Sequence, residues 1–223
     1  MLWTEIPVHV IDFEGSRETG IVEFGVVTLT GGVISEVATR LCRARVRVSA
    51  DETRVHGLRE ADLADAAPFA VEWERFAALR ANGVLAAHFS GTENALLRAV
   101  WPCPRLSPDF LHAGREVAEW GPWIDTGRLA TAMLPRGNGS SAALGDVVQA
   151  FGLAAALDEA ARRWCPEARR CYHCALFDAL ACALVLPRLA CDADGLPWTL
   201  AHTLAASTGD GARRDELRQG RLF

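Results

Sequence analysis

The sequence contains no lysine, so arginine is the source of every permanently positive side chain. The formal net charge is −5 at pH 7, which argues against a polycation that grips duplex nucleic acid through bulk charge. A local cluster of arginines remains a way to bind phosphate groups.

Long hydrophobic runs are also missing. No apolar segment approaches the roughly 20 residues that span a bilayer, and the N-terminus lacks the charged start and apolar stretch of a signal peptide. The seven cysteines are scattered without a regular framework, which is typical of reduced thiols in the cytosol. These absences predict a cytoplasmic protein that does not enter a membrane.

The chain does contain enough hydrophobic residues for a sizeable core. Half of its 223 residues are hydrophobic, so we expect one folded domain, over residues 1–190. We expect residues 191–223 to form a C-terminal extension, with a helix over 198–207 and a polar, mobile tail over 208–221.

The order of the segments predicts an α/β fold. Three runs rich in β-branched and aromatic residues, 7–13, 21–29 and 33–42, follow one another closely, which predicts an antiparallel three-strand meander. Helices and short strands are then expected to alternate, over residues 68–81, 84–89, 92–100, 123–126, 127–134, 141–151 and 173–189. This order indicates one mixed sheet with helices packed on it.

Two carboxylates end the first expected strand. Asp12 and Glu14 stand two residues apart, so their side chains point to the same face of a strand. Their charges repel each other unless a cation neutralises them, and Mg²⁺ or Mn²⁺ prefers such oxygen ligands. The structural alternative is a polar strand end that enters a loop.

A histidine and an aspartate stand out in the last apolar segment. His173 and Asp178 belong to an Ala-rich stretch that we expect to be helical, and both are expected to face one site from its first turns. The structural alternative is an aspartate that complements the dipole of the helix N-terminus.

Taken together, these motifs resemble the DnaQ-like family of DEDDh 3′→5′ exonucleases. The Asp12-Phe13-Glu14 motif follows a short N-terminal strand, and His173 and Asp178 follow late in the chain. Further segments resemble parts of the family pattern in the right order, namely residues 21–29, 55–76, 86–97, 123–130 and 141–153. The resemblance covers roughly residues 6–190 and implies an RNase H-like fold.

The resemblance also implies a reaction. It implies that two Mg²⁺ or Mn²⁺ ions flank a phosphodiester bond at a nucleic-acid 3′ end and that hydrolysis releases a nucleoside 5′-monophosphate. Asp12 would bridge both ions, and Glu14 and Asp178 would complete the first ion site. His173 would be the general base that deprotonates the attacking water.

Two parts of the chain depart from the family pattern. Glu93 stands five residues after His88, where the family has aspartate, and we expect this longer carboxylate to hold the second ion. A solvated glutamate in the first turn of a helix is the alternative. The first motif lacks the usual Thr-Thr-Gly continuation, and we expect substrate contacts from Phe13, Gly15, Ser16 and His88.

The C-terminus carries a separate short pattern. Residues 219–223 match the Gln-x-x-Leu-Phe sequence by which many bacterial replication and repair proteins bind the sliding clamp. Leu222 and Phe223 would enter an apolar groove of the clamp, and Gln219 would hydrogen-bond beside it. The alternative is that the last two residues fold back onto the core of this chain.

We therefore expect a DNA-repair or proofreading nuclease whose substrate is single-stranded DNA. One alternative is an enzyme that shortens RNA, as in the oligoribonuclease and RNase T relatives. The other is a nucleic-acid-binding module that has lost catalysis, for which Glu93 and the altered first motif are the support.

Overall fold

A five-stranded mixed sheet organises the computed structural model, which describes residues 1–134 and 142–219. Its strands are β1 (Val8–Ser16), β2 (Gly20–Thr30), β3 (Val33–Leu41), β4 (Val84–Ala87) and β7 (Ile124–Asp125). Their order is β3-β2-β1-β4-β7. The first three strands are antiparallel, whereas β4 pairs parallel with β1 and β7 pairs parallel with β4. The predicted α/β fold, with a mixed sheet that begins in an antiparallel meander, is confirmed.

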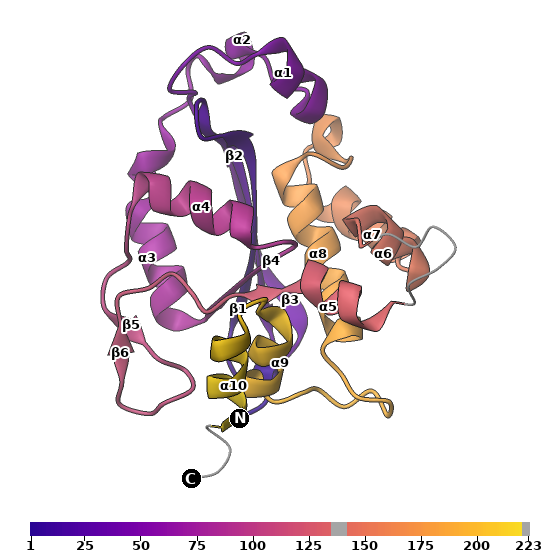
Figure 1. The fold of residues 1–223 in the computed structure, drawn as a ribbon. Helices are drawn as coiled ribbons and strands as arrows, with labels where there is room; N and C mark the ends of the chain where they lie inside the picture. Colours follow the sequence, from indigo (N-terminus) through magenta and orange to yellow (C-terminus); the bar gives the residue numbers. More distant parts are fainter. Residues whose placement is uncertain (135–141, 220–223) are drawn as a thin grey trace.

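Helices cover both faces of this sheet. The main ones are α3 (Trp73–Asn82), α4 (Gly91–Val100), α5 (Thr126–Met133), α6 (Leu144–Ala150), α7 (Ala154–Trp164) and α8 (Ala175–Leu189). In Figure 1 the sheet is seen nearly edge-on, with α3 and α4 on one side and α5 to α8 on the other. The sequence patterns predict most of these helices, but α7 was not expected.

The pleat of β1 decides which residues meet which layer. Ile11 and Phe13 pack into the apolar cluster that includes residues of α3 and α4. Val8 and Val10 pack into the cluster that contains most of α8. Because alternate side chains share a face, Asp12 and Glu14 continue the row of Val8 and Val10. The two carboxylates therefore lie on the side of the sheet that α8 covers.

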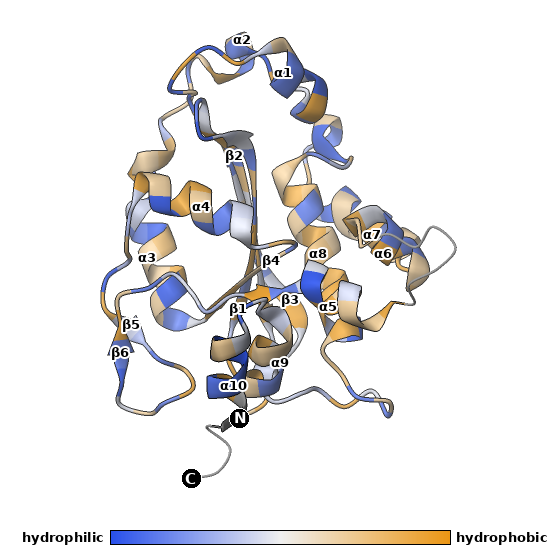
Figure 2. Cartoon of the chain, viewed as in Figure 1, coloured by the Kyte–Doolittle hydropathy of each residue, from blue (hydrophilic) through white to orange (hydrophobic). Residues whose placement is uncertain are grey.

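Helix α8 lies unusually close to the sheet at its N-terminal end. The helix is hydrophobic along most of its length (Figure 2) and packs against β1 and β2. Gly25 of β2, which is paired with Asp12 in the register, makes this approach possible. A Cβ atom on Gly25 would lie 2.3 Å from the carbonyl oxygen of Ala175. A larger residue here would push the start of α8 away from the strand that carries Asp12.

The remaining elements lie at the ends and edges of the sheet. They are η1 (Trp3–Glu5), α1 (Ala50–His56), α2 (Glu60–Leu63), η2 (Phe69–Glu72), β5 (Ser107–Pro108), β6 (Glu116–Val117), η3 (Glu167–Arg169), α9 (Leu200–Ser207) and α10 (Gly211–Gln219). Among the helices that the structure describes, none is both long and apolar enough to cross a bilayer.

The C-terminal extension contains one more helix than the sequence predicts. The expected helix over 198–207 is present as α9, which packs against α5 and β7. Within the expected tail over 208–221, Gly211–Gln219 form α10, which packs on α9. Asp210 accepts hydrogen bonds from backbone N–H groups at the start of α10, and Leu217 packs against the main core. One cap and one apolar contact are weak sequence signals in an otherwise polar segment.

The proposed clamp-binding pattern falls mostly beyond this helix. Gln219 is the last residue of α10, and Leu222 and Phe223 lie outside the described residues. The division of the chain at residue 190 and the role of this pattern stay predictions.

Candidate active site

The first two carboxylates come from the end of β1. Glu14 is 8% exposed, and Asp12 is partly buried two residues earlier on the same face. Directly after Glu14 the register of β1 and β2 shifts at a bulge. Gly15 has a φ of 122°, and a Cβ atom there would lie 2.1 Å from the carbonyl oxygen of Gly20. Glycine at this position therefore lets the hairpin close immediately beyond the two acids.

The next two groups come from the start of α8. Asp178 lies in the first turn of the helix, as expected, and is 9% exposed. His173 was expected in the helix but precedes it, with a φ of 63°, and its side chain is exposed. Oδ2 of Asp178 accepts a hydrogen bond of 2.9 Å from the backbone N–H of His173. This hydrogen bond gives the backbone N–H of His173 a partner outside the helical pattern and holds the residue just before the start of α8.

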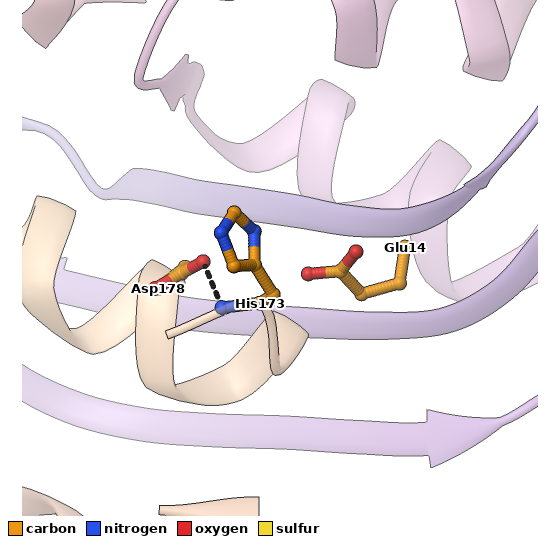
Figure 3. A group of neighbouring side chains, drawn as sticks. All are labelled: Glu14, His173 and Asp178. Carbon is orange, nitrogen blue, oxygen red and sulfur yellow. Dashed lines mark hydrogen bonds between the residues drawn. The ribbon is translucent and has the colours of Figure 1, made fainter. Parts of the chain in front are cut away.

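These elements bring three side chains to one place. A nitrogen of His173 and carboxylate oxygens of Glu14 and Asp178 all lie within 4.8 Å of one another. In Figure 3 the imidazole of His173 lies between the two carboxylates. Residues that are far apart in sequence thus form one group with oxygen and nitrogen ligands for a metal ion.

Glu93 is a further buried carboxylate near this group. It lies in the first turn of α4 and is 5% exposed, so the alternative of a solvated surface glutamate is excluded. Glu93 lies close enough to Asp12 that its charge raises the pKa of the Asp12 carboxyl. The structure therefore gathers Asp12, Glu14, Glu93, His173 and Asp178 around one end of the sheet.

Burial and mutual repulsion shape the protonation of these acids. Burial raises the pKa of Asp12 well above its usual range, and the charges of Asp178, Glu93 and Glu14 raise it further. Burial is also the largest cause that raises the pKa of Glu14 to about 8 and that of Glu93 to about 8. The pKa of Asp178 rises to about 7, mainly through burial, although the hydrogen bond from His173 opposes the rise. Ionising all four acids together thus costs free energy unless a cation compensates.

This environment fits divalent metal ions. Oε2 of Glu93 and Oδ1 of Asp178 are buried and have no hydrogen-bond partner within the described part of the chain. Buried carboxylate oxygens without partners are costly, and hard cations such as Mg²⁺ and Mn²⁺ bind such oxygens. Asp12, Glu14, Glu93 and Asp178 form the donor set that would hold them.

Two of the expected substrate contacts, Phe13 and His88, have partners within the chain. The ring of Phe13 is 6% exposed and packs against Phe69 and Phe76, with centroid separations of 5.4 and 5.7 Å. The strand pleat turns the Phe13 side chain away from Asp12 and Glu14, so the ring packs in the core, and a substrate contact of Phe13 stays a prediction. His88 uses one ring nitrogen on Thr126 Oγ1 (2.9 Å) and the other on the carbonyl oxygen of Ala142 (2.7 Å). Its polar atoms are thus committed to linking β4, α5 and the segment before α6.

The other two expected contacts lie in the hairpin. The backbone N–H of Ser16 donates to Thr19 Oγ1, and the Ser16 hydroxyl accepts from the backbone N–H groups of Glu18 and Thr19. Ser16 therefore stabilises the β1–β2 turn, which removes the backbone donor that was expected for substrate. Gly15 remains a predicted substrate contact, since it is partly exposed next to Glu14.

Sequence reasoning also missed two charged residues beside the site. Glu23 of β2 is paired with Glu14 in the register and is 3% exposed. Arg169, in η3, forms an ion pair with its carboxylate. The acid inside the apolar run 21–29 was a usable signal, because a charge in a buried strand requires a partner. Nothing in the sequence identifies Arg169 among its neighbouring arginines.

Comparisons with solved structures agree with this geometry at the level of the fold. No family model and no curated protein matches the chain. Exonuclease X in complex with 5′-overhanging duplex DNA superposes with a TM-score of 0.55 at 19% identity, over 85% of this chain and 97% of that one. The nuclease domain of 3′hExo, a DEDDh family member bound to rAMP, gives a TM-score of 0.56 at 18% identity, over 82% and 90% of the two chains.

A third structure extends the comparison to a longer protein. Escherichia coli Exonuclease I in complex with a dT13 oligonucleotide gives a TM-score of 0.57 at 13% identity, over 81% of this chain and 40% of that one. This chain therefore has the RNase H-like fold of DEDDh 3′→5′ exonucleases, as the sequence predicts.

We predict that metal ions stabilise the protein more at higher pH. Folding raises the pKa of Glu14 and Glu93 from about 4.5 to about 8. The stability that these two acids contribute is therefore complete below about pH 4.5 and is lost as the pH rises through about 8. Bound Mg²⁺ or Mn²⁺ stabilises the ionised acids and reverses this loss. Thermal unfolding in EDTA and in excess Mn²⁺, at about pH 5.5 and about pH 8, should show a larger Mn²⁺-induced rise in Tm at the higher pH.

The variant Glu93→Gln/Asp178→Asn is the control for this measurement. It should show a smaller Mn²⁺-induced rise at both pH values, because two ligands have lost their charge. If Mn²⁺ leaves the Tm of the parent protein unchanged at the higher pH, the metal site is contradicted.

Proposed function

We propose that this protein is a metal-dependent 3′→5′ exonuclease. The observation that carries the proposal is the convergence of Glu14, His173 and Asp178 within 4.8 Å, beside Asp12 and the buried Glu93. Four carboxylates suit two hard divalent ions, and an exposed imidazole next to them suits proton transfer from water. The exonuclease fold supports the same reaction class by analogy.

The roles that we propose follow from the chemistry of each side chain. Bound by the four carboxylates, Mg²⁺ or Mn²⁺ would supply positive charge and Lewis acidity at the scissile phosphate. His173 accepts a proton from the water that attacks phosphorus. The bond from phosphorus to the 3′-oxygen of the preceding nucleotide breaks, and this oxygen leaves with the electron pair and takes up a proton from solvent. Asp178 holds the backbone of His173 through its hydrogen bond. The product is a nucleoside 5′-monophosphate.

We propose single-stranded DNA as the substrate, with RNA as the alternative. The C-terminal pattern ending in Leu222 and Phe223 favours DNA, because the sliding clamp is a partner of DNA-processing proteins. The structural neighbours include complexes with DNA and one with a ribonucleotide, so they support a nucleic-acid substrate without choosing between the two.

We predict that purified protein in Mn²⁺ shortens 5′-labelled single-stranded DNA from its 3′ end. Asp12→Asn and His173→Ala should each abolish this shortening, because they remove a metal ligand and the proton acceptor. Asp158→Asn, a change of the same kind at an exposed position of α7, should leave it intact. Gel analysis of 5′-labelled DNA and RNA of the same sequence measures both activities.

The outcomes separate the three hypotheses. DNA left intact while RNA shortens would overturn the DNA substrate. Shortening that persists in Asp12→Asn would overturn the assigned active site. Inactivity of the parent protein on every substrate and with either metal would favour a binding module that has lost catalysis.

We also predict that Glu93 acts through its charge. A residue that hydrogen-bonds a metal ligand typically contributes about 10- to 100-fold to metal affinity or activity. Glu93→Gln removes a proposed ligand itself, so it should lower the rate by about 100-fold or more. Glu93→Asp keeps the charge and restores the side chain of the family pattern, so it should stay within about tenfold of the parent. Glu159→Gln, at an exposed position of α7, is the matched control. A Glu93→Gln rate equal to that of the control would remove Glu93 from the site.

A second proposal concerns the C-terminus. We infer that Gln219, Leu222 and Phe223 bind a bacterial sliding clamp. These three residues have the spacing of clamp-binding peptides, and the apolar pair Leu222 and Phe223 follows a polar segment. Deletion of residues 222–223 should weaken clamp binding at least tenfold, because apolar anchors dominate such contacts, while hydrolysis of short oligonucleotides stays unchanged. Surface plasmon resonance with immobilised clamp measures the first effect, and equal binding by both proteins would contradict the inference.

A further inference from the structure

One buried carboxylate fastens both ends of the segment that carries His173. Oε1 of Glu23 accepts a hydrogen bond of 3.1 Å from Nε of Arg169, and Oε2 accepts a second from Nη2 of the same side chain. Oε2 also accepts the backbone N–H of Ala175 at 3.0 Å. Residues 170–174 are therefore tied to β2 immediately before and immediately after the segment.

Arg169 is itself fixed from a second side. Its Nη1 donates a hydrogen bond of 2.6 Å to the carbonyl oxygen of His56, the last residue of α1. Three nitrogens of one guanidinium thus bind a carboxylate in β2 and a carbonyl in α1. This use of the planar fork is specific to arginine, because a lysine ammonium provides a point charge without the same geometry.

The tied segment holds His173 in a conformation that residues other than glycine seldom adopt. Its φ of 63° is in the left-handed region, which typically costs about 1–3 kcal/mol and requires support from the surroundings. The imidazole is exposed, so core packing does not hold the residue. The support comes from hydrogen bonds on the backbone, through Asp178 at His173 and through Glu23 at Ala175.

The ion pair also settles a conflict of charge on the sheet. Glu23 lies directly across from Glu14 in the register, and like charges in such a pair repel. The ion pair with Arg169 compensates the negative charge of Glu23. Glu14 is then the member of the pair that faces His173 and Asp178 (Figure 3).

We propose that Glu23 and Arg169 are positioning residues that hold the His173 imidazole where it can take a proton from the attacking water. This inference rests on the proposed exonuclease function and adds two residues to it. Neither residue needs to touch substrate or metal for this role. Their effect reaches the reaction through the backbone of residues 170–175.

The variant Arg169→Lys tests this role because it keeps the charge and removes the fork. Misplacement of a catalytic group by about 1 Å can cost on the order of 100-fold in rate, so kcat should fall about 10- to 100-fold. KM should stay within about twofold, since substrate binding does not involve the guanidinium. Amide hydrogen exchange, measured by NMR, should become faster at His173 and Ala175 than in the parent protein.

Arg170→Lys is the matched control on the same loop. Arg170 donates hydrogen bonds to the carbonyl oxygens of Cys165 and Arg162 rather than to Glu23. This control should keep the kcat, the KM and the exchange rates of the parent. An equal loss of kcat in both variants would overturn the proposal, because any change in the loop would then suffice.

Other outcomes also decide the question. Unchanged kcat and exchange in Arg169→Lys would contradict the positioning role, and so would a loss of kcat with unchanged exchange at His173 and Ala175. If Arg169→Lys fails to fold, Glu23→Gln/Arg169→Met removes both charges together and should show the same loss of kcat and faster exchange. An inactive parent would contradict the proposed exonuclease, whereas the exchange measurement still tests the role of Glu23 and Arg169.

Discussion

The burial of several carboxylates in one place is the constraint on which the rest of this site depends. Asp12, Glu14, Glu93 and Asp178 come from β1, α4 and α8, and burial raises the pKa of each. A protein that gathers acids in this way loses stability as they ionise, unless cations bind among them. Within the described part of the chain, Oε2 of Glu93 and Oδ1 of Asp178 have no hydrogen-bond partner, so an internal hydrogen-bond network does not offset the cost of ionising these acids.

The fold provides this arrangement through a few close fits. The pleat of β1 directs Asp12 and Glu14 toward α8, and Gly25 allows the start of that helix to approach the sheet. Gly15 lets the hairpin close immediately after Glu14. Glu23 and Arg169 then connect β2, α1 and the segment before α8. Each of these features fixes the position of the backbone near the candidate site. None of them needs to supply a metal ligand for this role.

The strands, most helices and the residues of the candidate site could be predicted from the sequence because they follow periodic rules. Alternation along β1 predicts that Asp12 and Glu14 share a face, and an apolar segment predicts α8. The position of His173 ahead of its helix could not be predicted, because it depends on hydrogen bonds that the N–H groups of His173 and Ala175 donate to Asp178 and Glu23, and Glu23 lies far away in the sequence. The burial of Phe13 followed from the same alternation, yet proximity in sequence to the acids suggested a substrate contact. Helix α10 escaped prediction because its stability depends on packing against α9 rather than on its own polar sequence.

We infer that the four carboxylates together bind two divalent ions. Titration of Mn²⁺ into metal-free protein, followed by the electron paramagnetic resonance signal of free Mn²⁺, measures the number of ions bound. We expect two Mn²⁺ ions per chain and the loss of at least one of them in Asp12→Asn. Binding of no ion, or equal binding by the parent and by Asp12→Asn, would contradict this inference.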